Sequence, residues 1–67
     1  MSDFKVGDRV RILSGVAIPF AGMEGTIREL WPHDRGIETM DRHIVVFARG
    51  EKRSFYGVEL AHIRKPQ

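Results

Sequence analysis

Polar and apolar side chains alternate along two stretches of the chain. Residues 9–12 alternate arginine with valine or isoleucine, which places both arginines on one face of an extended segment and predicts a strand. Gly25–Trp31 has similar strand character, and Pro32 ends it because proline cannot donate a hydrogen bond to a neighbouring strand. Ile27 and Leu30 are three residues apart, so this strand either contains a bulge or turns Leu30 to the other face.

The second half of the chain contains three more short segments. His43–Phe47 is rich in β-branched residues and apolar on both faces. It is either a central strand or a strand whose Val45 and Phe47 lie outside beneath a covering element. Residues 49–52 predict a tight hairpin turn with a glycine at positive φ, and Arg53–Tyr56 the partner strand. After it, a single helical turn at residues 57–60 and a last short strand at residues 61–64 are expected, with loops at residues 14–22 and 33–42.

Five short strands, a tight hairpin and a one-turn spacer predict an all-β domain, a small closed barrel of five strands with one short helical turn near the C-terminus. The 67 residues suffice for one hydrophobic core and not for two, so residues 1–67 form a single domain. The expected core consists of apolar side chains from all five strands and the N-terminal segment: Val6, Val10, Ile12, Ile27, Ile44, Val46, Phe55, Leu60 and Ile63.

The amino-acid composition excludes several kinds of site and indicates the cellular location of the protein. The chain has no cysteine, which removes disulfides, thiolate nucleophiles and cysteine-ligated metals. Its N-terminus lacks the apolar segment of a signal peptide, and the longest apolar run, residues 44–48, is far shorter than the roughly 20 residues of a membrane helix. We therefore expect a cytoplasmic protein without membrane contact.

The net charge of +2 hides a gradient along the chain. Residues 49–67 carry five basic and two acidic side chains, a net charge of +3, and the remainder is close to neutral. This basic end is either a solvated surface or a contact for an anionic partner such as RNA, DNA or an acidic protein.

The first half of the chain resembles a known motif. Residues 6–12, Ser14-Gly15 and residues 19–27, with their Pro-Phe-x-Gly loop and the glycine Gly25, resemble the KOW motif over about residues 4–30. That motif occurs on SH3-like barrels in NusG-type transcription elongation factors and in ribosomal proteins, and the resemblance implies an SH3-like barrel that contacts RNA or nucleoprotein. Gly25 would stand where no Cβ is tolerated. Residues 16–18 form an insertion in the loop that commonly meets the partner in KOW domains.

The second half resembles other SH3-like barrels. Its apolar strand, charged turn, aromatic strand and closing Val-Glu-Leu-x-x-Ile are similar to small accessory proteins of electron-transfer complexes, such as the SH3-like accessory protein of photosystem I and the variable chain of ferredoxin–thioredoxin reductase. Those barrels bind proteins, so this resemblance implies a protein partner.

Cationic and aromatic residues that could bind nucleic acid gather around the third hairpin. Phosphates require lysine or arginine, and single-stranded bases stack on aromatic rings. The candidates are Arg49, Lys52, Arg53 and Tyr56, with Trp31 and Phe20 as further aromatic contacts. The alternative is that Tyr56 and Trp31 cap the ends of the barrel and the cations are merely solvated.

A second basic face is formed by Arg9, Arg11 and Arg28 if adjacent strands align them. We expect acids such as Glu24 or Glu29 to interleave with these arginines. Without such acids this face would be the stronger phosphate-binding surface.

Apolar side chains of the first loop suggest a different surface. Val16, Ile18, Phe20 and Met23, joined by Val45 and Phe47 if these face outward, would form a contiguous patch of the kind that marks protein interfaces. Alternatively, the loop folds over one end of the barrel and buries these side chains.

Catalytic and metal signals are weak. His33, His43 and His62 match no metal-ligand spacing, and no nucleophile elbow or phosphate-binding glycine loop is present. The opening and closing segments are similar to plasmid-borne type II dihydrofolate reductases, but residues 52–55 replace the Val-Gln-Ile-Tyr segment that contacts ligand in that family.

The sequence thus predicts a non-enzymatic binding module without cofactor or metal. Its expected partner is RNA or the transcription and translation machinery, contacted through a basic and aromatic surface. A protein–protein accessory or regulatory subunit of a larger enzyme complex, using Phe20 and Met23, is the alternative.

Overall fold

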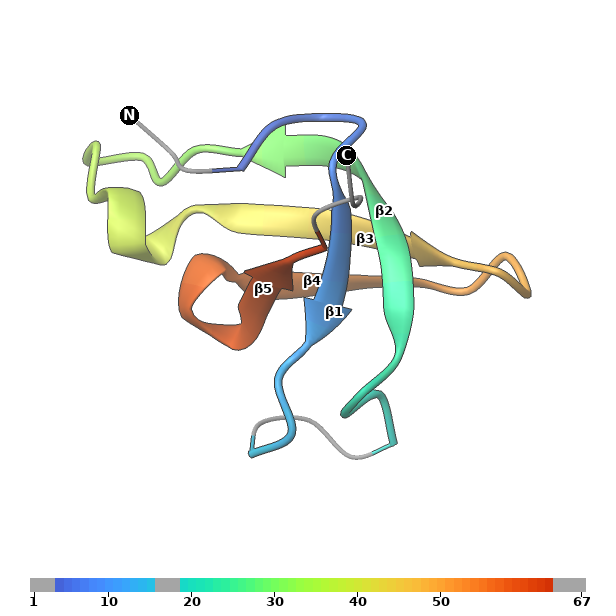
Figure 1. Ribbon diagram of the computed structural model, residues 1–67. Helices are drawn as coiled ribbons and strands as arrows, with labels where there is room; N and C mark the ends of the chain where they lie inside the picture. Colours follow the sequence, from blue (N-terminus) through green and yellow to red (C-terminus); the bar gives the residue numbers. More distant parts are fainter. Residues whose placement is uncertain (1–3, 16–18, 64–67) are drawn as a thin grey trace.

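The computed structural model describes residues 4–15 and 19–63, and within them the chain is all-β (Figure 1). The proposed insertion at residues 16–18, with Val16 and Ile18, and the basic residues Arg64 and Lys65 lie outside the described residues. The elements are the strands β1 (Arg9–Ile12), β2 (Glu24–Trp31), β3 (Arg42–Phe47), β4 (Lys52–Tyr56) and β5 (Leu60–His62), and the single 3-10 turns η1 (Glu38–Met40) and η2 (Gly57–Glu59). Within the described residues, neither helical segment has the length that crossing a membrane requires.

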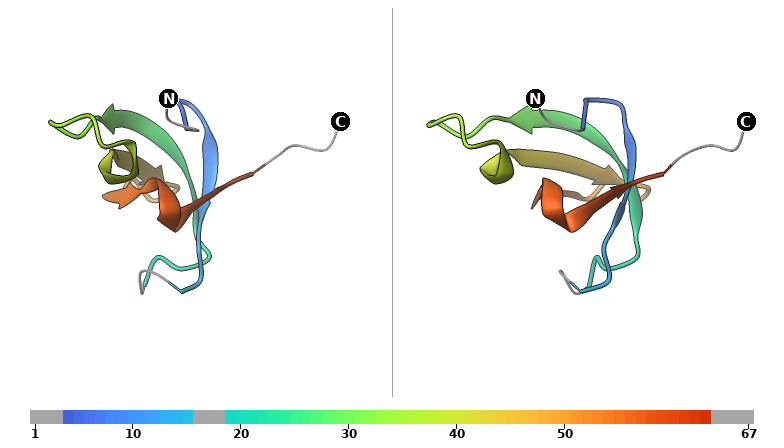
Figure 2. Two further views of the ribbon diagram at one scale, coloured as in Figure 1. Left: turned by 90° about the vertical axis from the view of Figure 1, so that its left-hand side faces the viewer. Right: turned by 60° about the vertical axis from the view of Figure 1, so that its left-hand side comes forward.

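The five strands form one antiparallel sheet in the order β4-β3-β2-β1-β5. Figure 1 and Figure 2 show that the sheet is strongly curved, with β1 running across the direction of β3 and β4. The predicted closure of the barrel is not found, because no ladder joins β4 to β5 in the described part of the chain. The one-turn connection η2 takes the place of that ladder between the two ends of the sheet.

The bulge that the sequence offered as one alternative is present in β2. Its register against β3 shifts between Ile27 and Glu29, so that Arg28 is the extra residue. As a result both Ile27 and Leu30 face the core, and Trp31 lies opposite Arg42 on the outer face.

The buried core lies inside the curve of the sheet and receives side chains from every strand: Phe4, Val10, Ile12, Ile27, Val45, Phe47, Phe55 and Leu60. The prediction for β3 was wrong, because Val45 and Phe47 are buried whereas Ile44 and Val46 are only half-buried. Because β3 is apolar on both faces, the alternation of its residues does not indicate which face is buried. His43 determines the choice, since it is 1% exposed beside Phe55, with its Nδ1 3.1 Å from the Phe55 carbonyl oxygen.

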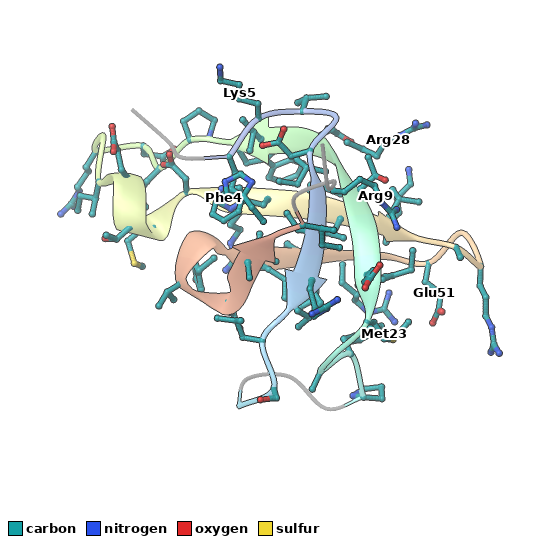
Figure 3. All side chains as sticks on the ribbon, in the orientation of Figure 1. Phe4, Lys5, Arg9, Met23, Arg28 and Glu51 are labelled. Carbon is teal, nitrogen blue, oxygen red and sulfur yellow. The ribbon has the colours of Figure 1, made fainter. Side chains whose placement is uncertain are left out.

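Val6 was also misplaced, since it is 59% exposed. A turn holds it outward: the Asp8 N–H donates to the Lys5 carbonyl (3.1 Å), and the Lys5 N–H donates to the Asp8 carboxylate (2.9 Å). Phe4 occupies the core instead and points from the N-terminal segment toward the sheet (Figure 3). Its ring stacks on His62 at 4.2 Å between centroids. Ile63 of the expected core is half-buried.

The two predicted turns, the β3–β4 hairpin and the helical turn before the last strand, are confirmed. Gly50 adopts a φ of +88° in the β3–β4 hairpin, a conformation that glycine adopts without strain. The helical turn expected before the last strand is η2, in which the Glu59 carboxylate accepts a hydrogen bond of 2.8 Å from the Tyr56 N–H. These turns place β4 at one end of the sheet, with its outer face open to solvent.

Candidate functional site

The outer face of β2, β3 and β4 carries three rows of side chains that run across the strands. The β2–β3 and β3–β4 registers define the rows Trp31–Arg42–Tyr56, Glu29–Ile44–Ser54 and Thr26–Val46–Lys52. Side chains of register partners lie on the same face of a sheet, with Cβ atoms about 5 Å apart. The rows therefore collect aromatic, cationic and hydroxyl groups on one surface.

A groove of about 410 Å³ lies on this surface and is called here the β2–β4 groove. Its lining consists of one indole, one aliphatic side chain, one hydroxyl residue and three cationic residues: Trp31, Ile44, Ser54, Arg42, Lys52 and Arg53. The sequence predicted Trp31, Lys52 and Arg53 as contacts, and all three line the groove. Arg53 is the register partner of buried Val45, so its side chain leaves β4 on the core face, opposite the face of Trp31 and Arg42. Arg42 was missed, since it lies opposite Trp31 only because of the β2 bulge.

Trp31 does not cap an end of the sheet. Its residue is 57% exposed, and its indole Nε1–H donates to Glu29 Oε1 at 3.2 Å. Because only one edge of the indole is engaged by this bond, the ring keeps surface for a planar ligand. Glu29 is the acidic side chain next to the groove, and its carboxylate is directed to the indole N–H.

Arg42 is held in a fixed orientation on β3. Its NH1 donates to Ser54 Oγ and its NH2 to the Tyr56 hydroxyl oxygen, each at 3.0 Å. The guanidinium carbon lies 5.0 Å from the centre of the Tyr56 ring. The structure thus places the Tyr56 ring and hydroxyl directly against the Arg42 guanidinium.

Phe20 and Met23 lie elsewhere. Phe20 is half-buried and stacks on Phe47 with ring centroids 5.2 Å apart, and Met23 also packs against the core. The Arg53 guanidinium carbon lies 5.3 Å from the centre of the Phe20 ring, and its NH1 donates to the Lys52 carbonyl oxygen. Neither Phe20 nor Met23 lines the groove.

Arg49 is exposed in the β3–β4 turn and is not among the lining residues of the groove. The seven predicted contacts therefore do not form one surface. Three line the groove, Tyr56 lies beneath Arg42, two pack on the core and Arg49 lies in the hairpin turn.

Val45 and Phe47 do not join the apolar patch considered for a protein partner, and Val16 and Ile18 of that patch lie outside the described residues. Val45 and Phe47 are buried at 0% and 3% exposure, which removes them from the surface. Phe20 covers Phe47 at one end of the core, in agreement with the alternative that the loop folds over the sheet.

The arginines on β1 differ from the groove cations in their electrostatic partners. Glu24 bonds Arg11 at 2.8 Å and lies 3.8 Å from Arg9, so the predicted interleaving by an acid is confirmed. Arg28 on the bulge is exposed and points away from the sheet (Figure 3). Within residues 4–15 and 19–63, no ion pair involves Arg42, Lys52 or Arg53. In the described part of the chain, these cations therefore have no carboxylate within ion-pair distance, and the nearby Glu29 carboxylate is bonded to the Trp31 indole N–H.

The histidines have separate local partners. His43 lies in the core, and His62 Nδ1 is 3.7 Å from Asp8 Oδ2. The backbone N–H of His33 donates to Asp41 Oδ1 at 2.8 Å, and the His33 ring Nδ1 accepts from the Arg35 backbone N–H at 3.2 Å. Among the described residues, no three side chains of His, Asp or Glu are grouped as metal ligands.

Comparisons of the chain with protein-family models, with curated proteins and with solved structures give no match. The resemblances to KOW domains and to electron-transfer accessory proteins therefore stay predictions. The geometry of the β2–β4 groove is the basis of the functional argument that follows.

Proposed function

We propose that this chain is a small non-enzymatic binding module that holds single-stranded RNA in the β2–β4 groove. The observation that carries the proposal is the exposed indole of Trp31 on the same face as two cationic side chains, Arg42 and Lys52, which form no ion pair among the described residues. Cations beside an aromatic platform are the two elements that single-strand binding requires.

Each element has a distinct task in this mechanism. A base stacks on the indole of Trp31, which is worth about 1–3 kcal/mol per base in single-strand binding proteins. Arg42 and Lys52 neutralise phosphates and release counterions. Half-buried Ile44 lies on the middle strand of the groove between the cationic residues and adds apolar contact to the base.

The geometry favours a single strand over a duplex. Bases in a duplex are stacked on one another and cannot lie flat on an external ring, whereas bases of loops and ends can. The resemblance to KOW domains adds a setting for such RNA, in transcription or on the ribosome. In that setting the chain would dock a larger assembly to exposed single-stranded segments.

Salt dependence provides the test of the proposal. Neutralisation of two phosphates on a single strand predicts a slope of about −1.4 for log K against log salt concentration. Fluorescence anisotropy of a labelled oligouridine of roughly ten nucleotides, titrated with protein between about 50 and 200 mM salt, measures this slope. The control is the same oligonucleotide annealed to its complement, which should bind more weakly.

Absence of binding at about 50 mM salt would remove the RNA function. A salt-insensitive complex with a protein from the native host would then favour the accessory-subunit alternative.

A further inference from the structure

Arg42 differs from the other cations of the groove in how its charge is held. Its guanidinium has five N–H donors, of which two are used for Ser54 Oγ and the Tyr56 hydroxyl. Three donors remain, and both protein acceptors are neutral hydroxyls, so the positive charge is oriented without being neutralised. The Tyr56 ring, 5.0 Å from the guanidinium carbon, covers one side of the group.

Arg11 on β1 provides a comparison within the same sheet, because its charge is neutralised by a carboxylate of the chain. It is also exposed, and its guanidinium bonds the Glu24 carboxylate at 2.8 Å. Arg42 has a comparable cross-strand position, but its partners across the strand are hydroxyls. An arginine fixed in this way is arranged to receive an oxyanion from outside the chain, since two parallel N–H groups match the two oxygens of a phosphodiester.

We infer that Arg42 is the phosphodiester-binding residue of the β2–β4 groove, and that Ser54 and Tyr56 are its positioning residues. The inference rests on the proposed function and deepens it by assigning the phosphate contact to one guanidinium. Trp31 and Arg42 are register partners on β2 and β3, so a base on the indole and its own phosphate are bound by adjacent side chains.

The two other groove cations have a different role. Arg53 donates to the Lys52 carbonyl oxygen and lies over Phe20, on the face of β4 that also carries buried Phe55. Lys52 has no hydroxyl partner that fixes its ammonium group among the described residues. Lys52 therefore raises the local positive potential of the groove without a fixed geometry, and Arg53 adds charge from the other face of β4.

Charge-conserving variants separate these roles. Arg42→Lys keeps the charge and loses the planar fork, and it should weaken binding of a labelled oligouridine about tenfold or more. The salt slope of this variant should stay near that of the wild type, because the charge is kept. Arg11→Lys is the matched control, because Arg11 lies on β1 outside the groove, and it should bind within about twofold of the wild type.

The positioning role has its own readout. Tyr56→Phe keeps the ring and removes the hydroxyl acceptor, so affinity should fall by a few-fold, about what one hydrogen bond contributes. In the Arg42→Lys background the same change should have no further effect, because Tyr56 acts through the guanidinium. An equal loss in both backgrounds would overturn the positioning role.

Thermal unfolding checks that Arg42→Lys is folded, as expected for an exposed residue. Wild-type affinity in a folded Arg42→Lys variant would overturn the assignment of the phosphate to Arg42 while leaving RNA binding intact. Failure of the wild type itself to bind oligouridine would instead overturn the proposed function. Preferential binding to the duplex would contradict the single-strand assignment.

Discussion

Replacement of Trp31 by alanine is expected to weaken oligouridine binding by about five- to 150-fold, which corresponds to the loss of one base–aromatic stack. Trp31 is 57% exposed and its indole is bonded only to Glu29 among the described residues. The fold should therefore remain stable to within about 0.5 kcal/mol.

The measurement is the anisotropy of labelled oligouridine with wild-type and Trp31→Ala protein at one salt concentration. Val58→Ala is the matched control, since Val58 is 79% exposed and does not line the β2–β4 groove. Because Trp31 is the single tryptophan of the chain, quenching of its fluorescence in the wild type reports the same contact. Equal affinities for the two variants would exclude the indole as the stacking platform.

Gly25→Ala should destabilise the fold by about 3 kcal/mol or more, the upper range for an overpacked core. A Cβ at this position would lie 2.6 Å from Val45 Cγ1 and 2.8 Å from the Val46 carbonyl oxygen. Val45 is fully buried and Val46 is paired with Lys52, so neither atom can move without disturbing β3. For a domain with roughly 3–10 kcal/mol of stability, this change removes a large share.

Thermal unfolding followed by circular dichroism measures the effect, with an expected fall in the midpoint of about 12 °C or more. Gly15→Ala is the matched control, because a Cβ there would meet no atom within 4 Å. A midpoint for Gly25→Ala equal to that of Gly15→Ala would contradict the close approach of β2 and β3 at Gly25.

The sequence pattern was informative where one face of a segment is polar. The arginines of β1 alternate with buried Val10 and Ile12, and the uneven spacing of Ile27 and Leu30 offered the β2 bulge that is observed. The intolerance of Gly25 to a Cβ was expected from the resemblance to the KOW motif, in which a glycine stands where the loop enters the second strand. The structure adds the reason, which is the backbone and side chain of β3.

The pattern was uninformative where both faces of a strand are apolar, or where tertiary contacts determine which side chains are buried. His43 is buried because the Phe55 carbonyl oxygen satisfies it, and this bond fixes Val45 and Phe47 inside. No local signal in the sequence reveals a partner twelve residues away on the next strand. The absence of a ladder between β4 and β5 in the described residues likewise depends on the geometry of the turn η2.

The residues of the candidate site could be predicted from the sequence only in part, because tertiary contacts also determine which of them lie together. The sequence signal for the β3–β4 hairpin was recognisable, so the placement of Lys52 and Arg53 on the strand after it was predictable. Arg42 lies at the end of a long loop in the sequence, and its position opposite Trp31 follows from the one-residue register shift at Arg28. The pairing of Arg42 with Trp31 can therefore be recognised only once the register of β2 against β3 is known.

A titration of ¹⁵N-labelled protein with unlabelled oligouridine, followed by two-dimensional ¹H–¹⁵N spectra, tests the central claim most directly. The proposal predicts that the indole N–H of Trp31 and the backbone amides of Arg42 and Ser54 shift first and most. Shifts confined to the first loop around Phe20 and Met23, with the groove resonances unchanged, would contradict it.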